Sequence, residues 1–173
     1  ENEGKTNPRG RRALALLSAD GSVTLEEALT IATDTFIDRS DRWQNALAQA
    51  CSQFPPESPD LISAVGLISG WDGRTDVDSR GGALFRFWLR ACRERNSGVP
   101  RSEIWAGRPL EPEAQQALLK ALTKAAVQLV AHFGRIDVEW GATYRAQRGN
   151  RSWPVAGCRA DGLQTLRAAY GSR

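Results

Sequence analysis

Few side chains in this sequence are of a type that could carry out nucleophilic or acid–base chemistry unaided. His132 is the single histidine of the 173 residues, and no serine or cysteine lies in the GxSxG spacing of a nucleophile elbow. A Ser-His-Asp arrangement needs a histidine beside the nucleophile, so we interpret His132 as a structural residue at a helix end, where an imidazolium suits the helix dipole. The sequence also lacks a phosphate loop and an HExxH motif. We therefore assign no catalytic and no cofactor-binding residue in this chain.

The closely spaced carboxylates are better explained as helix starts than as acid–base pairs. Glu26 and Glu27 come at the first turn of one expected helix, and Glu111 and Glu113 at the first turn of another. Negative charge at these positions is stabilised by the helix dipole and by capping.

The possible metal ligands do not have the spacing of a known site. Three aspartates superficially suggest a calcium loop, but the glycine and closing glutamate of an EF-hand are absent in register; they are Asp72, Asp76 and Asp78. We expect Asp78 to cap the helix that follows. The three cysteines, Cys51, Cys92 and Cys158, have no CxxC spacing, so no zinc site is predicted. Because Cys51 and Cys92 both fall on apolar helix faces, we predict a bridge between them if the protein is extracytoplasmic.

The composition is that of one globular domain with a small positive charge. The net charge is +3, and 20 of the 23 basic residues are arginine, the preferred group for phosphate contacts. Nucleic-acid binding is therefore an alternative, but 20 acidic residues are interleaved with the arginines, which favours a compositional bias. No apolar run is long enough to span a membrane, and the polar opening Glu1-Asn2-Glu3 shows no signal peptide.

Five or six helices are predicted before residue 134. Their boundaries are marked by caps and prolines: a helix from Pro8 to about 17, one opened by the Thr24–Glu27 capping box, one from about 41 to 54, one from Pro59 to Gly70, one capped by Asp78, and one from Pro112 to about 133. Residues 102–109 are expected to be irregular, with Trp105 anchoring them to the helices.

Apolar spacing predicts the buried face of each helix. In the first two helices the expected buried residues are Ala13, Leu14, Leu17, Leu25, Leu29, Ala32 and Phe36, with Arg9 and Arg12 towards solvent. In the middle helices they are Trp43, Leu47, Ala50, Cys51, Phe54, Leu61, Ile62, Val65 and Ile68. In the later helices they are Leu84, Phe85, Trp88, Leu89, Cys92, Leu118, Leu122, Ala125, Leu129 and Val130, with Arg86, Arg90 and Arg93 pointing away.

The stretch from Ile136 to Gly157 is the part of the sequence that is predicted to form β-sheet. Ile136, Val138 and Trp140 alternate with acidic residues, the period of a strand with one buried face, and Gly149-Asn150 marks a turn. Such a hairpin is marginal on its own, so we expect its sheet partners to lie outside these 173 residues. Residues 163–170 are expected to form a further short strand or a frayed helix.

These elements predict an α+β fold. A helical region, residues 1–133, is followed by a hairpin and strand region, residues 134–173, that joins a larger sheet core. The sequence shows no internal repeat and no low-complexity segment.

Several short motifs resemble the large subunit of penicillin amidase-type acylases. They are Asn7-Pro8-Arg9-Gly10-Arg11-Arg12-Ala13-Leu14, Thr24-Leu25-Glu26 with Ala32 and Asp34, Trp71-Asp72-Gly73 with Phe85 and Trp88, and Trp140-Gly141 with Arg145, Arg148-Gly149, Pro154-Val155 and Gly157. Their order and spacing cover nearly the whole chain. The family includes penicillin acylases and acyl-homoserine lactone acylases.

The resemblance implies an αββα N-terminal nucleophile hydrolase fold that belongs to a periplasmic or secreted protein. It implies autoproteolytic processing of a precursor, with a small subunit and a segment bearing an N-terminal Ser as partners, and an N-acyl amide as substrate. It also implies a role in the degradation of antibiotics or quorum signals, without a cofactor. The Ser amine would act as base through water, and an Asn would help to stabilise the oxyanion.

This sequence departs from that pattern because Glu1 cannot serve as the nucleophile. Asn2 lies nearest the oxyanion region of the family but does not match its motif. The expected role is therefore architectural, with helices that flank the catalytic sheet. The alternatives are a helical module that binds a protein partner through tryptophan-rich faces, and the arginine-rich nucleic-acid binder.

Overall fold

The chain divides into two units, one of them a group of helices packed around buried tryptophans. This computed structural model describes residues 7–19 and 21–167. The helical unit comprises Arg39–Asp72 and Ser79–Glu139. The mixed unit draws on Glu1–Asp38, Gly73–Asp78 and Trp140–Arg173. Each unit is therefore assembled from separate stretches of the sequence.

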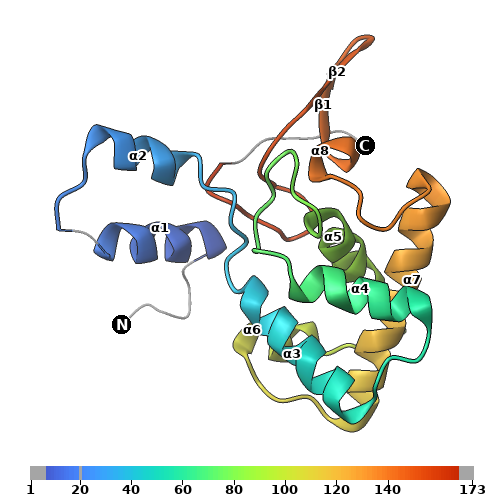
Figure 1. Cartoon of the computed structure of the whole chain (residues 1–173). Helices are drawn as coiled ribbons and strands as arrows, with labels where there is room; N and C mark the ends of the chain where they lie inside the picture. Colours follow the sequence, from blue (N-terminus) through green and yellow to red (C-terminus); the bar gives the residue numbers. More distant parts are fainter. Residues whose placement is uncertain (1–6, 20, 168–173) are drawn as a thin grey trace. The chain divides into compact units, whose positions relative to one another are not determined.

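The helical unit packs four helices and a short fifth one around an aromatic core (Figure 1). Its elements are α3 (Ser40–Gln53), α4 (Pro59–Ser69), α5 (Gly82–Ala91), α6 (Arg101–Ala106) and α7 (Pro112–Phe133). The long helix α7 contacts α3, α4 and α5. Trp43 is fully buried, and its ring centroid lies 6.0 Å from Phe85, 5.3 Å from Trp88 and 5.4 Å from Trp105, all edge-to-face. This geometry suits the quadrupoles of aromatic rings.

The mixed unit combines three helices with a two-stranded antiparallel sheet. Its helices are α1 (Pro8–Ser18), α2 (Leu25–Ala32) and α8 (Trp140–Thr143), and its strands are β1 (Arg145–Arg148) and β2 (Arg151–Pro154). The register pairs Arg145 with Pro154 and Arg148 with Arg151 across the turn at Gly149-Asn150. In Figure 1 the hairpin extends beyond α8. The mixture of helices and an antiparallel sheet in the described chain confirms the α+β class.

The strand predicted over Ile136–Trp140 is wrong, although the turn at Gly149-Asn150 is confirmed. Gly134 ends α7 with a φ of 75°, and the chain then runs without regular structure except for a single bridge between Glu139 and Arg80. Trp140 begins α8 instead of ending a strand. Val138 and Trp140 are buried as expected. The predicted burial was thus correct at these two positions, but buried side chains two residues apart do not require a ladder of hydrogen bonds.

The helix caps follow the sequence closely. The Asn7 side chain accepts a hydrogen bond from the Gly10 amide at 2.9 Å with Pro8 at the first helical position, and Thr24 and Glu27 form the capping box. Two expectations are wrong. Residues Arg101–Ala106 form α6 instead of an irregular segment, and α5 is preceded by Gly81 at φ 113°, so Asp78 does not cap it.

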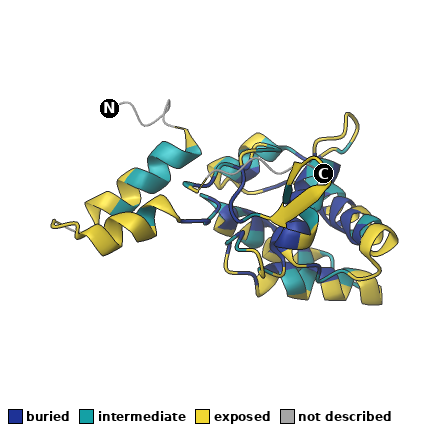
Figure 2. Ribbon diagram, turned by 90° about the horizontal axis from the view of Figure 1, so that it is seen from above, coloured by how far each residue is buried: buried dark blue, intermediate teal, exposed yellow. Residues whose placement is uncertain are grey.

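The buried faces predicted for α1 and α2 are wrong. Neither helix has a buried residue, and Leu14, Leu17 and Leu29 are exposed, as is Leu25 at 80% (Figure 2). Arg12 is instead half-buried against the rest of the mixed unit. An apolar stripe was read as the inner face, whereas ion pairs determine which face of α1 points inwards.

The faces of the later helices are largely as predicted. Trp43, Leu47, Ala50, Phe85, Trp88 and Leu118 are all fully buried. Ile62 and Val130 are exposed instead, and Arg86 is 4% exposed although it was expected to point away from the core. The other differences are side chains that are half-buried where burial was expected: Cys51, Phe54, Leu61 and Val65.

The cysteines are all free, so the predicted Cys51–Cys92 bridge is wrong. Residues 163–167 have no regular structure, so the strand expected there is not observed, and its end at 168–170 lies outside the described residues. No helix in the described part of the chain is both long and apolar enough to cross a membrane.

Candidate functional site: an arginine–aspartate cluster

A buried carboxylate at Asp34 is the centre of the mixed unit. Its side chain is 5% exposed and accepts from Arg12 Nε at 2.8 Å on Oδ2 and from Arg74 Nη1 at 3.0 Å on Oδ1. A buried charge is costly unless it is paired and hydrogen-bonded, and two guanidinium groups meet both needs. Helix α1 and the segment at Gly73–Asp78 are thereby joined to the residues that follow α2.

The main chain and a second ion pair extend this cluster. The Asp34 carbonyl accepts from the Arg167 amide at 2.9 Å, which brings the C-terminal segment to the same point. Arg11 Nε donates to Asp38 Oδ2 at 2.8 Å. The guanidinium carbon of Arg12 lies 4.4 Å from the centre of the Phe36 ring, within the range of a cation–π contact.

Threonines complete the connection between these segments. The Thr75 amide and hydroxyl both donate to the Thr35 carbonyl, at 3.2 and 2.9 Å. The Thr75 carbonyl in turn accepts from the Gly157 amide at 2.9 Å. Thr35 Oγ1 donates to Asp76 Oδ1 at 2.8 Å, so the Asp76 carboxylate is engaged within the fold.

Aromatic side chains hold the base of the hairpin. Trp140 and Tyr144 are fully buried with ring centroids 4.9 Å apart, and Trp140 Nε1 donates to the Val155 carbonyl at 3.1 Å. A Cβ on Gly141 would lie 2.6 Å from Val77 Cγ1 and 2.8 Å from Pro154 Cβ, so only glycine fits between them. The hairpin is therefore anchored at one end, while β2 and the second half of β1 are exposed.

The arrangement around Asp34 positions chain segments and contains no nucleophile paired with a base in the contacts described. His132 is exposed at the end of α7 in the helical unit, with Nδ1 2.7 Å from the Gln128 carbonyl oxygen. Burial raises the pKa of the Cys92 thiol to about 12, despite the nearby Arg101, and burial also raises the pKa of Cys51. Both thiols are therefore held in the unreactive protonated form. Among the described residues no three histidine, cysteine or acidic side chains gather as metal ligands.

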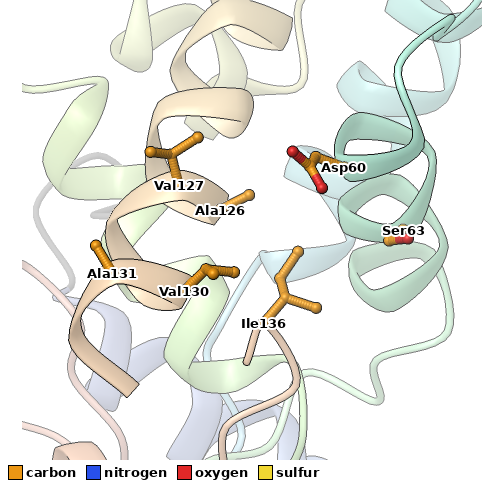
Figure 3. Close-up of a pocket in the computed structure, with 7 residues that line it drawn as sticks. All are labelled: Asp60, Ser63, Ala126, Val127, Val130, Ala131 and Ile136. Atoms are coloured by element: carbon orange, nitrogen blue, oxygen red, sulfur yellow. The ribbon is translucent and has the colours of Figure 1, made fainter. Parts of the chain in front are cut away.

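An apolar pocket of about 380 Å³ lies in the helical unit between α4, α7 and Ile136 (Figure 3). Val127, Val130 and Ala131 line one side of it, and Asp60 and Ser63 of α4 line the other. Figure 3 shows the Asp60 carboxylate directed towards α7. The pocket has the size of a small-molecule site, but Asp60 is the only charged residue among the described residues that line it.

The motifs noted in the sequence include two residues of this cluster whose contact was not predicted. Arg12 and Asp34 were both part of the resemblance, but Arg12 was placed towards solvent and Arg74 was not singled out. The available signal was the cluster of three arginines at 9, 11 and 12 on a helix followed by aspartates at 34 and 38. Glu1 and Asn2, which were weighed as nucleophile and oxyanion residue, lie outside the described residues.

The sequence model of the penicillin amidase family matches residues 2–170. The chain therefore belongs to the penicillin amidase family, a class of amidohydrolases. A separate search of curated proteins found no match to the chain. Some of the residues that suggested this family hold the mixed unit together: Asn7 caps α1, Arg12 pairs with Asp34, and Gly157 donates to Thr75.

Proposed function

We propose that this chain is an architectural part of an acylase that hydrolyses the amide between an acyl chain and an amine-bearing head group, such as an acyl-homoserine lactone or a penicillin. The family match over residues 2–170 is the observation that carries this proposal. The catalytic Ser would come from another segment of the same processed precursor. The chain would contribute the helices and the hairpin that support the catalytic sheet.

The contacts around Asp34 support an architectural role. Arg12, Arg74 and the Arg167 amide approach this residue from three stretches that are far apart in the sequence. Their donors are satisfied within the chain, which makes them suited to fixing a backbone and leaves little capacity for binding a substrate. The position of the hairpin then depends on residues such as Trp140, which are themselves buried in the mixed unit.

Exposed apolar side chains support association with other chains of the assembly. Leu14, Leu25 and Leu29 are exposed on α1 and α2, and Trp153 is 49% exposed on β2. Large apolar patches on a protein surface commonly mark interaction sites. Trp140 is fully buried, so of these two tryptophans it is Trp153 that contributes to the exposed apolar surface.

The proposal is tested with the full precursor and its mature chains. The assembled protein should release free acid from a chromogenic acyl-anilide or from an acyl-homoserine lactone. Replacing the N-terminal Ser of the mature subunit by Ala should abolish this release, because the attacking oxygen is removed. A mature assembly that is inert towards short, long and aromatic acyl amides would contradict the proposed activity.

The architectural role has a separate test. The 173-residue chain alone should not hydrolyse any of these substrates, and turnover by it would refute the role proposed here. In the assembled enzyme, Asp34→Asn should lower the yield of mature protein. The KM of the molecules that do mature should change less than this yield. Glu26→Gln, at an exposed carboxylate of the same unit, is the matched control.

We further propose a periplasmic or secreted location, which suits a protein that meets antibiotics or quorum signals outside the cytoplasm. Fractionation of cells that express the native gene tests this. Activity confined to the cytosolic fraction would contradict it.

A further inference from the structure

The tip of the hairpin places two arginines directly opposite each other. Arg148 on β1 and Arg151 on β2 are register partners, and both are exposed. Like charges opposite each other on neighbouring strands destabilise a sheet. In the described part of the chain no carboxylate pairs with either guanidinium group. The hairpin is therefore most stable when an anionic group from elsewhere lies between them.

The same face of the hairpin also presents an indole. Side chains alternate between the two faces of a strand, so the Ala146–Trp153 pair lies on the same face as the Arg148–Arg151 pair. Trp153 is 49% exposed beside the small Ala146. On the other face the Arg145 side chain is engaged within the hairpin, because it donates from Nε to Ser152 Oγ at 2.9 Å and from Nη2 to the Ser152 carbonyl at 3.0 Å.

The sheet also has open edges. Its strand order is β1-β2, so among the described residues each strand has a partner on one side only. On β2, Pro154 has no amide hydrogen to donate, and the Ser152 carbonyl already accepts from Arg145. The edge of β1 is thus the better template for an incoming strand. A backbone edge of this kind selects a polypeptide over a nucleic acid, since only a peptide can continue the ladder.

We propose that an extended acidic segment of a polypeptide docks along β1, with an acidic residue beside Arg148 and an apolar residue beside Ala146 that reaches Trp153. The two residues would be two positions apart in the partner, because the side chains of a strand repeat on one face with a period of two. The proposal rests on the proposed function only for the source of this segment, which would be another chain of the same precursor.

A peptide titration tests the proposal. The probe is Thr-Glu-Thr-Val-Thr-Glu-Thr-Val, which puts the acidic and apolar residues on one face, and the reference is the same peptide with Lys in place of Glu. Binding to the 173-residue chain is followed by tryptophan fluorescence, with Trp153→Phe to identify the signal. We expect the acidic peptide to bind more tightly, and its affinity to fall with salt as expected for exposed charges.

Charge reversal gives the matched comparison. The double variant Arg148→Glu/Arg151→Glu should weaken binding of the acidic peptide by at least about tenfold and should favour the Lys peptide. The control Arg95→Glu/Lys120→Glu makes the same change in net charge at two exposed sites of the helical unit and should leave binding unchanged. Circular dichroism of each variant confirms that it is folded.

Three outcomes would overturn the proposal. They are equal binding of the two peptides, equal loss in the two double variants, or tighter binding of a single-stranded oligonucleotide such as oligo(dT), which would assign the face to nucleic acid. None of these readouts depends on hydrolysis. Failure here can therefore be distinguished from failure of the acylase assignment, which is measured with the assembled enzyme.

Discussion

In the helical unit Trp43 is fully buried and its ring meets three other aromatic rings, whereas in the mixed unit neither α1 nor α2 has a buried residue. The first unit is organised by apolar contacts between helices. The second is organised by a buried carboxylate with two guanidinium partners and by backbone hydrogen bonds between distant segments. The comparison teaches that an apolar residue on an amphipathic helix marks the core in one unit and an outer surface in the other.

The largest expected effect separates the two units directly. Trp88→Ala should lower the free energy of unfolding by about 3–5 kcal/mol, because a fully buried ring that also donates to the Leu118 carbonyl is removed. Leu25→Ala in α2 should cost less than about 0.5 kcal/mol, because the leucine is exposed. Urea unfolding measures both, and equal midpoints would mean that the two regions do not differ as described.

Two glycines sharpen the comparison at the level of the backbone. Gly157 in the mixed unit has φ 80°, and a Cβ there would lie 2.0 Å from the Arg167 carbonyl oxygen. Gly157→Ala should therefore cost about 3 kcal/mol from strain and overlap together. Gly134 in the helical unit has φ 75° with no atom near its Cβ position, so Gly134→Ala should cost only about 1 kcal/mol. Thermal unfolding of the two variants gives the difference, and a Gly157 variant as stable as the Gly134 variant would contradict the close approach.

The ion pairs of the mixed unit provide the third test. Asp34→Asn leaves Arg12 and Arg74 without their shared carboxylate and should cost about 2 kcal/mol, which is less than for a fully buried pair because Arg74 is partly exposed. Glu26→Gln should cost less than about 0.5 kcal/mol in urea unfolding, because this carboxylate is exposed and only its interaction with the helix dipole at the start of α2 is lost. If Asp34→Asn were as mild, the cluster would not be the anchor of the unit.

The smallest expected effect is a dependence on pH in the helical unit. The folded protein holds the Cys92 thiol proton more tightly than the unfolded chain, because burial raises its pKa from 9.0 to about 12. This contribution to stability is complete below pH 9.0 and is lost as the pH rises towards about 12. Between about pH 8 and about pH 10, wild type should lose about 1 kcal/mol more than Cys92→Ala. Equal losses in the two proteins would show that the thiol is not buried.

The sequence was most informative where a local rule is sufficient. The caps at Asn7 and Thr24, the turn at Gly149-Asn150 and the apolar face of α5 were all predicted, since each depends on residues within a few positions of one another. Asp34 and Arg74 are 40 residues apart, so no local pattern indicates that they meet. The motifs that contain Arg12 and Asp34 were thus recognised, but the site that these residues form with Arg74 was not.

The same reasoning accounts for the errors on α1 and on Ile136–Trp140. A hydrophobicity pattern assumes that apolar side chains face inwards, and it fails on α1, where Arg11 and Arg12 make the inward contacts. The alternation of apolar and acidic residues from Ile136 to Trp140 was interpreted as a strand, but the hydrogen bonds of this segment are not those of a ladder. Which polar groups pair is a property of the whole fold.

The hydrogen bonds that join distant segments of the mixed unit have a consequence for the order of folding. The Thr75 amide donates a hydrogen bond to the Thr35 carbonyl, and the Gly157 amide donates to the Thr75 carbonyl. The Arg167 amide donates to the Asp34 carbonyl. A ribosome must therefore release the chain as far as Arg167 before this unit can close, whereas the helical unit ends at Glu139. Contacts of long sequence separation also form slowly, since a long loop must close first. In pulsed hydrogen exchange we expect amides around Trp43 and Trp88 to gain protection before those of Thr75 and Gly157.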